Sequence, residues 1–196
     1  MRAANRDRVE SPRNWGATAD ETARHYPCDD LGFAASDVFF RAIAVAADAE
    51  LAYRWLCQLR VAPYSYDLLD NFARPSPPRL VAGTERLEVG QRLMTIFRLV
   101  SFERPRRLTL ALDSRLGRTL MGDLAGTYAV ETVPGGVRIV AKILVRYPRG
   151  LYGRLLGRAM PWMDLVMFRK QMLTLKRYIE RDATASRTPP TRDPLR

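Results

Sequence analysis

WMDLVMFRKQMLTLKRYIERD, residues 162–182, is the stretch that decides the fold. Its apolar side chains recur at steps of three and four, the spacing of one helical face at about 100° per residue. These side chains are Trp162, Leu165, Phe168, Met172, Leu175 and Ile179. The cationic residues Lys170, Arg177 and Arg181 fall on the far side. The stretch therefore predicts a long helix that packs one face against other elements.

Alternating apolar runs precede this helix and predict β-strands at 38–45, 91–102, 108–113, 124–133 and 137–147. The turn at 103–106 joins one antiparallel pair, and Pro134-Gly135-Gly136 joins another. Strands first and a closing helix last predict an α+β domain, in which a curved antiparallel sheet wraps around the long C-terminal helix. That arrangement favours an apolar cavity between sheet and helix.

A second helix is expected between the first strand and the others. Asp48 is its N-cap, the helix covers 49–60, and Pro63 ends it. Residues 64–71 then form a short helix or an ordered loop. Residues 148–161, with their glycines and prolines, are expected to link sheet and closing helix, with a short helix around 152–156.

The chain divides into three parts by composition. Residues 1–30 are polar without a sustained period and predict a mobile or loosely docked arm. Residues 31–183 carry the ligand-binding domain, and residues 184–196, rich in Pro, Thr, Ser and Arg, are expected to be a disordered tail.

The net charge of +11 comes almost entirely from arginine. Such a balance favours contact with acidic surfaces, but solubility and an arginine-biased composition are the preferred explanation. Cys28 and Cys57 are too few for a disulfide framework, so we expect free thiols and a cytoplasmic protein. No run of 18 apolar residues predicts a membrane-spanning helix.

The element order over residues 37–180, and three local phrases, resemble the helix-grip fold of the SRPBCC superfamily. The phrases are RVAPYSYD at 60–67, LEVGQ at 87–91 and PWMDL at 161–165. The superfamily includes START lipid-transfer domains and polyketide cyclase-like proteins. The resemblance implies an apolar cavity between the concave face of the sheet and the last helix. It also requires strands between 78 and 91, where the sequence shows no clear strand pattern.

Two groups of residues are candidates for polar chemistry. Tyr64, Tyr66, Asp67 and Asp70 lie close together, and two carboxyl groups near phenols could polarise a ligand carbonyl or move a proton. The structural alternative is that they cap and pack a short helix. Arg98 sits between apolar strand residues, so it binds an anionic group if that face is interior, and nothing follows if it is exterior.

The expected lining of the cavity combines inward strand residues with the closing helix. The candidates are Phe97, Leu110, Tyr128, Ile139, Ile143, Trp162, Leu165, Phe168 and Met172. A shift of one residue in register would exchange the two strand faces, and a plain core role is an alternative for the helix residues.

Residues 146–158 interleave arginines with tyrosines and leucines. The pattern suits an anionic membrane surface, and a plain solvated connection is the alternative; nucleic acid is not an expected partner. His25 is the sole histidine, so neither a catalytic triad nor a metal site is predicted, and the glycines match no phosphate loop or other cofactor motif.

The sequence thus predicts binding or transport of a small, mainly apolar ligand, such as a lipid, a polyketide or an aromatic molecule, in an internal cavity. The alternative is a polyketide cyclase or dehydratase that uses Tyr66, Asp67 and Asp70. The sequence decides neither whether a reaction is catalysed, nor the ligand, nor the oligomeric state.

Overall fold

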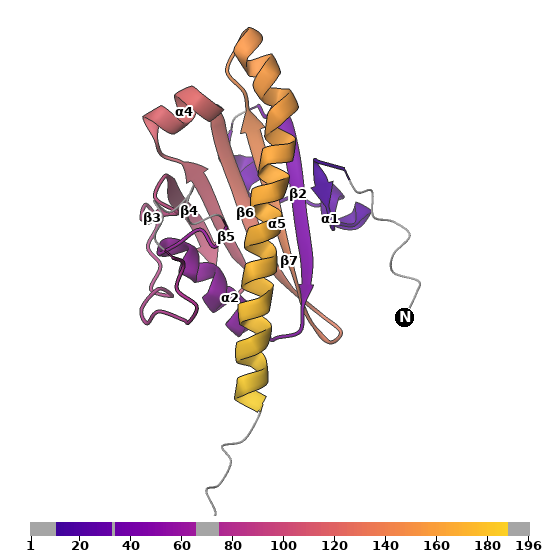
Figure 1. The fold of residues 1–196 in the computed structure, drawn as a ribbon, viewed down its shortest axis with the longest axis vertical. Helices are drawn as coiled ribbons and strands as arrows, with labels where there is room; N and C mark the ends of the chain where they lie inside the picture. The colour runs from indigo at the N-terminus through magenta and orange to yellow at the C-terminus, as the bar shows by residue number, and fades with distance from the viewer. Residues whose placement is uncertain (1–10, 33, 66–74, 188–196) are drawn as a thin grey trace, which may run out of the picture.

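The computed structural model describes residues 11–32, 34–65 and 75–187, and its centre is one curved sheet crossed by a long helix (Figure 1). The sheet has the order β1-β2-β7-β6-β5-β4-β3. Its strands are β1 (Asn14–Trp15), β2 (Asp37–Val45), β3 (Arg92–Leu93), β4 (Phe97–Glu103), β5 (Arg107–Leu112), β6 (Asp123–Val133) and β7 (Gly136–Arg146). The helices are α1 (Ala19–Ala23), η1 (Pro27–Leu31), α2 (Ala49–Cys57), η2 (Gln58–Arg60), α4 (Arg115–Met121) and α5 (Leu151–Arg187). The α+β helix-grip arrangement is confirmed.

The two predicted antiparallel pairs are present, β4 with β5 and β6 with β7. The Asp48 cap is also confirmed, because its carboxylate accepts a hydrogen bond from the backbone N–H of Leu51 at 2.7 Å. Among the strands of the described residues, β1 alone departs from the antiparallel pattern, since it pairs with β2 in parallel. The stretch 91–102 was expected as one strand, but Met94 and Thr95 have positive φ and make a turn that separates β3 from β4. Between 75 and 91 the structure contains turns and no strand.

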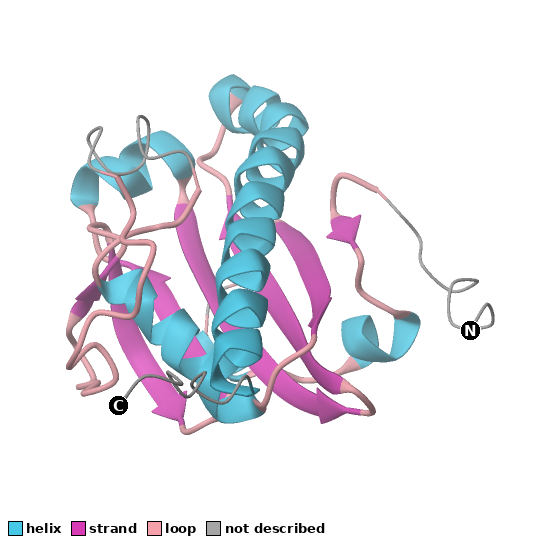
Figure 2. Ribbon diagram, turned by 60° about the horizontal axis from the view of Figure 1, so that its bottom comes forward, coloured by secondary structure: helices cyan, strands magenta, loops and turns pink. Residues whose placement is uncertain are grey.

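The closing helix is longer than predicted and runs without interruption from Leu151 to Arg187. Residues 148–161 were expected as a link, yet most of them belong to this helix, with Pro161 inside it. The tail expected from 184 onward begins as helix, and the rest of it lies outside the described residues. Along its length α5 crosses the concave face of the sheet, with α2 beside it on the same face (Figures 1 and 2).

The described part of the expected N-terminal arm packs on the convex face. Tyr26 and Cys28 lie in a second, smaller core with Phe40, Val140 and Leu144. Ion pairs hold this segment to the sheet, among them Arg138 with Glu21 and Lys142 with Asp29, both at 2.7 Å. Both faces of the central strands are therefore covered, which explains why so many of their residues are apolar.

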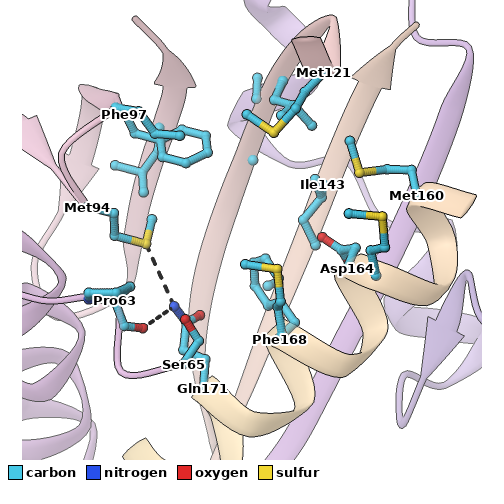
Figure 3. Close-up of a pocket in the computed structure, with 18 of the residues that line it drawn as sticks. Pro63, Ser65, Met94, Phe97, Met121, Ile143, Met160, Asp164, Phe168 and Gln171 are labelled. Atoms are coloured by element: carbon cyan, nitrogen blue, oxygen red, sulfur yellow. Dashed lines mark hydrogen bonds between the residues drawn. The ribbon is translucent and has the colours of Figure 1, made fainter. Parts of the chain in front are cut away.

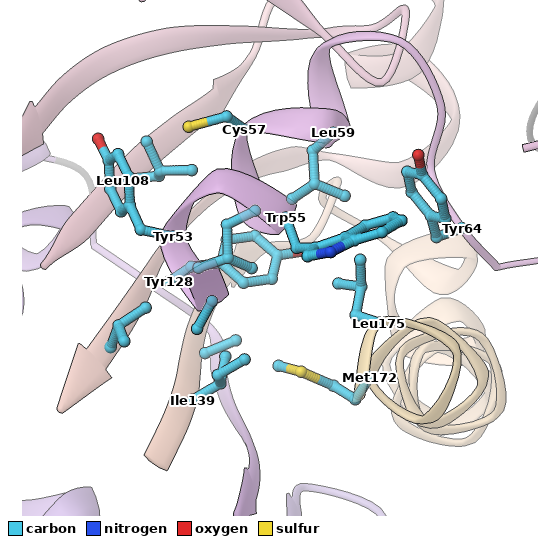
Figure 4. Close-up of a cluster of buried hydrophobic side chains, with 14 of the residues drawn as sticks. Tyr53, Trp55, Cys57, Leu59, Tyr64, Leu108, Tyr128, Ile139, Met172 and Leu175 are labelled. Atoms are coloured by element: carbon cyan, nitrogen blue, oxygen red, sulfur yellow. The ribbon is translucent and has the colours of Figure 1, made fainter. Parts of the chain in front are cut away.

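The main core occupies one half of the concave groove. Trp55 and Leu59, from α2 and η2, meet Met172 and Leu175 of α5 over Ile139 of β7, and all five are fully buried (Figure 4). Large side chains of α2 fill this half of the groove. The other half, toward α4 and the first turns of α5, is not covered by α2.

Candidate functional site

A cavity of about 530 Å³ lies in the unfilled half of the groove (Figure 3). The sheet contributes Leu110, Leu124, Tyr128 and Ile143 to its wall. Leu110 of β5 pairs with Gly126 of β6, and Gly126 pairs with Ile143 of β7. Residues paired across neighbouring strands lie side by side on the same face of the sheet, here the face of the cavity. Gly126 adds no side chain, which deepens the hollow at its centre.

The first half of α5 closes the cavity from the other side. Met160, Met163, Met167 and Phe168 point into it, and the Phe168 ring stacks on Tyr128 with centroids 5.8 Å apart. Five of the six methionines among the described residues line this one space: Met160, Met163 and Met167 of α5, together with Met94 and Met121. Methionine side chains are flexible and polarizable, so the wall can adapt to ligands of different outline.

Three non-glycine residues of the described chain have positive φ; two of them lie in the cavity wall, and the third lies between two wall residues. Met94 (φ 47°) and Thr95 (φ 66°) line the cavity, and Tyr64 (φ 57°) stands between Pro63 and Ser65, which also line it. Left-handed backbone is unfavourable for side chains of this size, and such residues gather at binding sites more often than elsewhere. The turn at 94–95 is held by a hydrogen bond from the Met94 N–H to the Leu59 carbonyl, 2.8 Å.

Gln171 forms a polar floor where the cavity meets the core. Its Oε1 accepts a hydrogen bond from the Tyr128 hydroxyl at 2.6 Å, and its Nε2 donates to the Pro63 carbonyl at 2.6 Å. Burial raises the pKa of Tyr128 above its usual value, so this phenol stays protonated. These bonds satisfy the buried groups internally, and they fix the ring that stacks on Phe168.

A buried ion pair joins Arg41 to Asp164, and Asp164 lines one side of the cavity. Arg41 is fully buried on β2 and donates from Nε (3.0 Å) and Nη2 (2.7 Å) to the same atom, Asp164 Oδ2. Its other N–H groups reach the carbonyls of Phe40 and Pro12. Asp164 Oδ1 has no hydrogen-bond partner among the described residues, and its side chain belongs to the cavity wall.

Burial is the largest cause of the pKa shifts of both Asp164 and Arg41. Burial raises the pKa of Asp164 to about 6, although the positive charge of Arg41 and its hydrogen bonds act in the opposite direction. Burial likewise lowers the pKa of the Arg41 guanidinium. The cavity therefore holds a carboxyl group that can gain or lose a proton near neutral pH.

Sequence reasoning missed both members of this pair. Arg41 shares the inward face of β2 with Phe39, and a charged residue among the apolar residues of the strand predicted at 38–45 was the available signal. Asp164 follows Met160 and precedes Phe168 by four residues, so all three share one helical face. The helix predicted over 162–182 already places Asp164 and Phe168 on one face, and the start at Leu151 adds Met160 to it.

Five residues of the predicted lining border the cavity: Phe97, Leu110, Tyr128, Ile143 and Phe168. Ile139 and Met172 are fully buried but belong to the solid half of the groove, because α2 packs over them. Their predicted place in the lining is therefore wrong. Whether the five residues bind a ligand stays a prediction.

The remaining candidates lie elsewhere. Trp162 is 59 % exposed and points away from the sheet, and Leu165 is half-buried outside the cavity. Arg98 is exposed on the outer face, so the interior placement considered for it is wrong. Tyr64 packs in the core against Trp55 and Tyr178. Tyr66, Asp67 and Asp70 lie outside the described residues.

The cavity opens between α4 and the start of α5. Three of its lining residues, Leu120, Tyr152 and Met163, are half or more exposed to solvent. The Tyr152 hydroxyl donates to the Leu120 carbonyl at 2.5 Å and ties the two helices together at this mouth. Helix α4 was not predicted; its signal was Ser114, whose hydroxyl accepts from the Gly117 N–H as an N-cap.

The described residues contain no group of three or more His, Cys, Asp or Glu side chains placed to hold a metal ion. None of their helices is both long and apolar enough to cross a bilayer.

Comparison with known proteins found no matching family model and no match among curated proteins. Solved structures do resemble the chain. SA2116 from Staphylococcus aureus, a protein of unknown function, is 12% identical with a TM-score of 0.49, covering 75% of this chain and 95% of that one. NE0264 from Nitrosomonas europaea is 12% identical with a TM-score of 0.44, covering 74% and 95%.

A third solved structure is the di-domain ARO/CYC StfQ from the steffimycin biosynthetic pathway. It is 11% identical with a TM-score of 0.45, and the match covers 75% of this chain and 51% of that one. At such identities and scores the similarity assigns neither a ligand nor a reaction to this chain. Membership of the SRPBCC superfamily stays a prediction.

Proposed function

We propose that this chain binds a small, mainly apolar molecule in the cavity between α5 and the sheet. The observation that carries the proposal is the cavity itself, about 530 Å³ and lined chiefly by Leu, Ile, Phe and Met side chains. Ligand sites for small molecules span roughly 300–1,000 Å³ and are mostly apolar with a few placed polar groups. The cavity has these properties.

The bound molecule carries one hydrogen-bond donor, directed at Asp164. The carboxylate is fixed through Oδ2 by two N–H groups of Arg41, and the Asp164 side chain lines the cavity. A hydroxyl or amine hydrogen bonded to a carboxylate in an apolar setting is favourable, whereas a second carboxylate placed there would be repelled. The ligand class is thus a neutral or weakly basic lipid, polyketide or aromatic molecule with a donor group.

Native mass spectrometry of the protein purified from cells tests the first part. A retained apolar molecule is the expected result. A protein that carries nothing, and that also fails to bind N-phenylnaphthylamine, a neutral apolar probe with one N–H donor, would contradict the proposal.

Cavity-filling variants locate the binding. Leu124→Trp and Met167→Trp each add a large ring to the wall, and each is expected to weaken probe binding about tenfold or more, since the ring occupies the ligand's volume. Val89→Trp is the matched control, because Val89 is 66 % exposed outside the cavity. Equal probe binding by all three variants would place the probe elsewhere.

The predicted hydrogen bond from the ligand to Asp164 is tested with two probes that differ only in the donor group. Phenoxynaphthalene has almost the shape of N-phenylnaphthylamine but an ether oxygen in place of the N–H. We expect the amine to bind more tightly, by roughly tenfold, because a hydrogen bond to a charged group is worth about 1.5–3 kcal/mol. The preference should shrink in Asp164→Asn.

The enzymatic alternative, a polyketide cyclase or dehydratase, stays a prediction that rests on Tyr66, Asp67 and Asp70. Replacing both carboxylates by amides, Asp67→Asn with Asp70→Asn, should leave probe binding intact and abolish turnover of a polyketide-like substrate if the alternative holds. Turnover that survives both changes would remove these residues from the chemistry.

A further inference from the structure

Helix α5 is apolar on two opposite faces over its first half. One face, with Met160, Asp164 and Phe168, closes the cavity. The other face carries Leu151, Leu155, Trp162 and Val166, spaced by four, seven and four residues, each more than half exposed. An amphipathic helix on a sheet needs only the first of these faces. The second face therefore has no packing role within the described chain.

The exposed face continues onto α4. Leu116 is 69 % exposed and Leu120 50 %, and the Tyr152–Leu120 hydrogen bond joins the two helices. We call these exposed residues the rim patch: Leu116, Leu120, Leu151, Tyr152, Leu155, Trp162, Met163 and Val166. Soluble monomers rarely expose so many large apolar side chains together, and such patches mark sites of association.

The rim patch surrounds the mouth of the cavity. Leu120, Tyr152 and Met163 belong both to the patch and to the cavity lining. A surface that binds to the rim patch would therefore lie directly over the mouth of the cavity. An apolar ligand could pass between that surface and the cavity without crossing water, which is costly for apolar area.

Exposed arginines surround the same patch: Arg115 and Arg118 on α4, Arg149 in the preceding turn, and Arg154 and Arg158 on α5. None of these five takes part in an ion pair with a described residue. Between Asp123 and Glu180 the chain has only two acidic residues, Glu131 and Asp164. Glu131 pairs with Arg24 and Asp164 with Arg41. The rim is therefore apolar and strongly cationic at once.

We propose that the rim patch docks on the surface of an anionic phospholipid bilayer. The apolar side chains enter the headgroup and upper acyl region, and the five arginines meet lipid phosphates and carboxylates. Charge complementarity selects this occupant over a second copy of the chain, because a twofold contact through this face would bring arginines against arginines. The proposal goes beyond cavity binding and does not depend on the ligand.

Vesicle co-sedimentation tests the proposal with the full chain. We expect binding to phosphatidylcholine vesicles that contain phosphatidylserine, and much weaker binding to phosphatidylcholine alone. Raised salt should reduce binding without abolishing it, because screening removes the charge contribution and leaves the apolar one. Loss of all binding at raised salt would overturn the insertion of the apolar side chains.

Two double variants separate the contributions. Arg154→Gln with Arg158→Gln should weaken binding about thirtyfold, since each basic residue near an anionic surface contributes about fivefold. Leu155→Gln with Trp162→Gln should weaken it comparably and remove the blue shift of Trp162 fluorescence on docking. The matched controls are Arg86→Gln with Arg92→Gln and Val89→Gln, all exposed away from the rim.

Three results would overturn the proposal. One is no binding to phosphatidylserine vesicles, and a second is an equal loss in the controls and the rim variants. The third is a dimer in sedimentation velocity that Leu155→Gln with Trp162→Gln dissociates, since a second copy would then cover the patch. The rim variants should keep N-phenylnaphthylamine binding, and Leu124→Trp should keep docking, so failure of docking and failure of cavity binding are distinguishable.

Discussion

Arg41 is the most informative single residue of the fold, because a guanidinium with no exposed surface sits on the concave face of β2. Its positive charge is tolerated only because Asp164 and two backbone carbonyls accept its N–H groups. Removing one partner of such a pair leaves the other as an uncompensated buried charge. The ion pair therefore holds the first half of α5 against β2, and both residues are needed for it.

A double-mutant cycle at this pair is the first prediction. Asp164→Leu and Arg41→Met should each lower the free energy of unfolding by about 3–5 kcal/mol, since each strands one partner. The double variant should recover most of that loss, because two apolar side chains replace both charges. Urea unfolding measures all four proteins. Additive losses would mean that the two residues act independently.

The second prediction concerns pH. The pKa of Asp164 is raised to about 6 in the folded protein, so the folded state favours the protonated form. The contribution of this group to stability is therefore present below its usual value near 4 and is lost as pH rises through about 6. Arg41, Tyr128 and Tyr147 are the titratable groups that interact with it; burial lowers the pKa of Arg41 and raises the pKa of both tyrosines.

Comparison with Asp164→Asn isolates the effect, because the amide does not titrate. Between pH 4 and 7, wild type should lose about 2 kcal/mol relative to the variant, which is most of the energy equivalent of a pKa shift of about two. Chemical denaturation at several pH values measures the difference. A difference that stays constant with pH would contradict the raised pKa.

At the scale of elements, α5 shows how tertiary packing overrides local signals. Gly153, Gly157 and Pro161 predicted a break between sheet and helix, since all three are unfavourable in a helix interior. The helix continues because the chain at Tyr147–Pro148 folds back against it. A Cβ on Gly153 would lie 1.7 Å from the Pro148 carbonyl oxygen, and one on Gly157 would lie 3.2 Å from the Tyr147 ring. The glycines permit this close approach.

The third prediction uses these two glycines as a matched pair. Gly157→Ala should change stability by less than about 1 kcal/mol, because the gain in helix propensity offsets a tight contact with a ring. Gly153→Ala should cost about 1–3 kcal/mol, because the clash is with backbone and the chain must move. Thermal or urea unfolding ranks them. Equal stability of the two variants would contradict the packing of residues 147–148 on α5.

At the scale of the whole molecule, the N-terminal segment completes the convex side of the sheet. Glu21, almost fully buried, accepts two hydrogen bonds from Arg138, at 2.8 Å and 2.7 Å. Burial raises the pKa of Glu21, but the bonds from Arg138 and Thr18 outweigh it, so the pKa lies below its usual value. This contact ties the start of the chain to β7.

The fourth prediction follows from that contact. Glu21→Gln should lower the free energy of unfolding at neutral pH by ~2 kcal/mol, since it removes a charge-assisted pair. Because the folded pKa is lowered, the stabilisation is present above the usual pKa near 4.5 and disappears as pH falls through the folded value. The gap between wild type and variant should therefore close in acid. A gap independent of pH would show that charge is not its source.

The sequence by itself determined the fold class, because apolar periodicity reports which face of each strand and helix is buried. It gave the two hairpins, the Asp48 cap and five of the cavity residues. Only the tertiary structure decided where the groove is solid and where it is hollow, since that depends on α2 covering Ile139 and Met172 but not Ile143 and Phe168. It also brought Arg41 to Asp164, 123 residues away, and left the rim patch exposed. Periodicity along one element carries no information about which distant element lies above it.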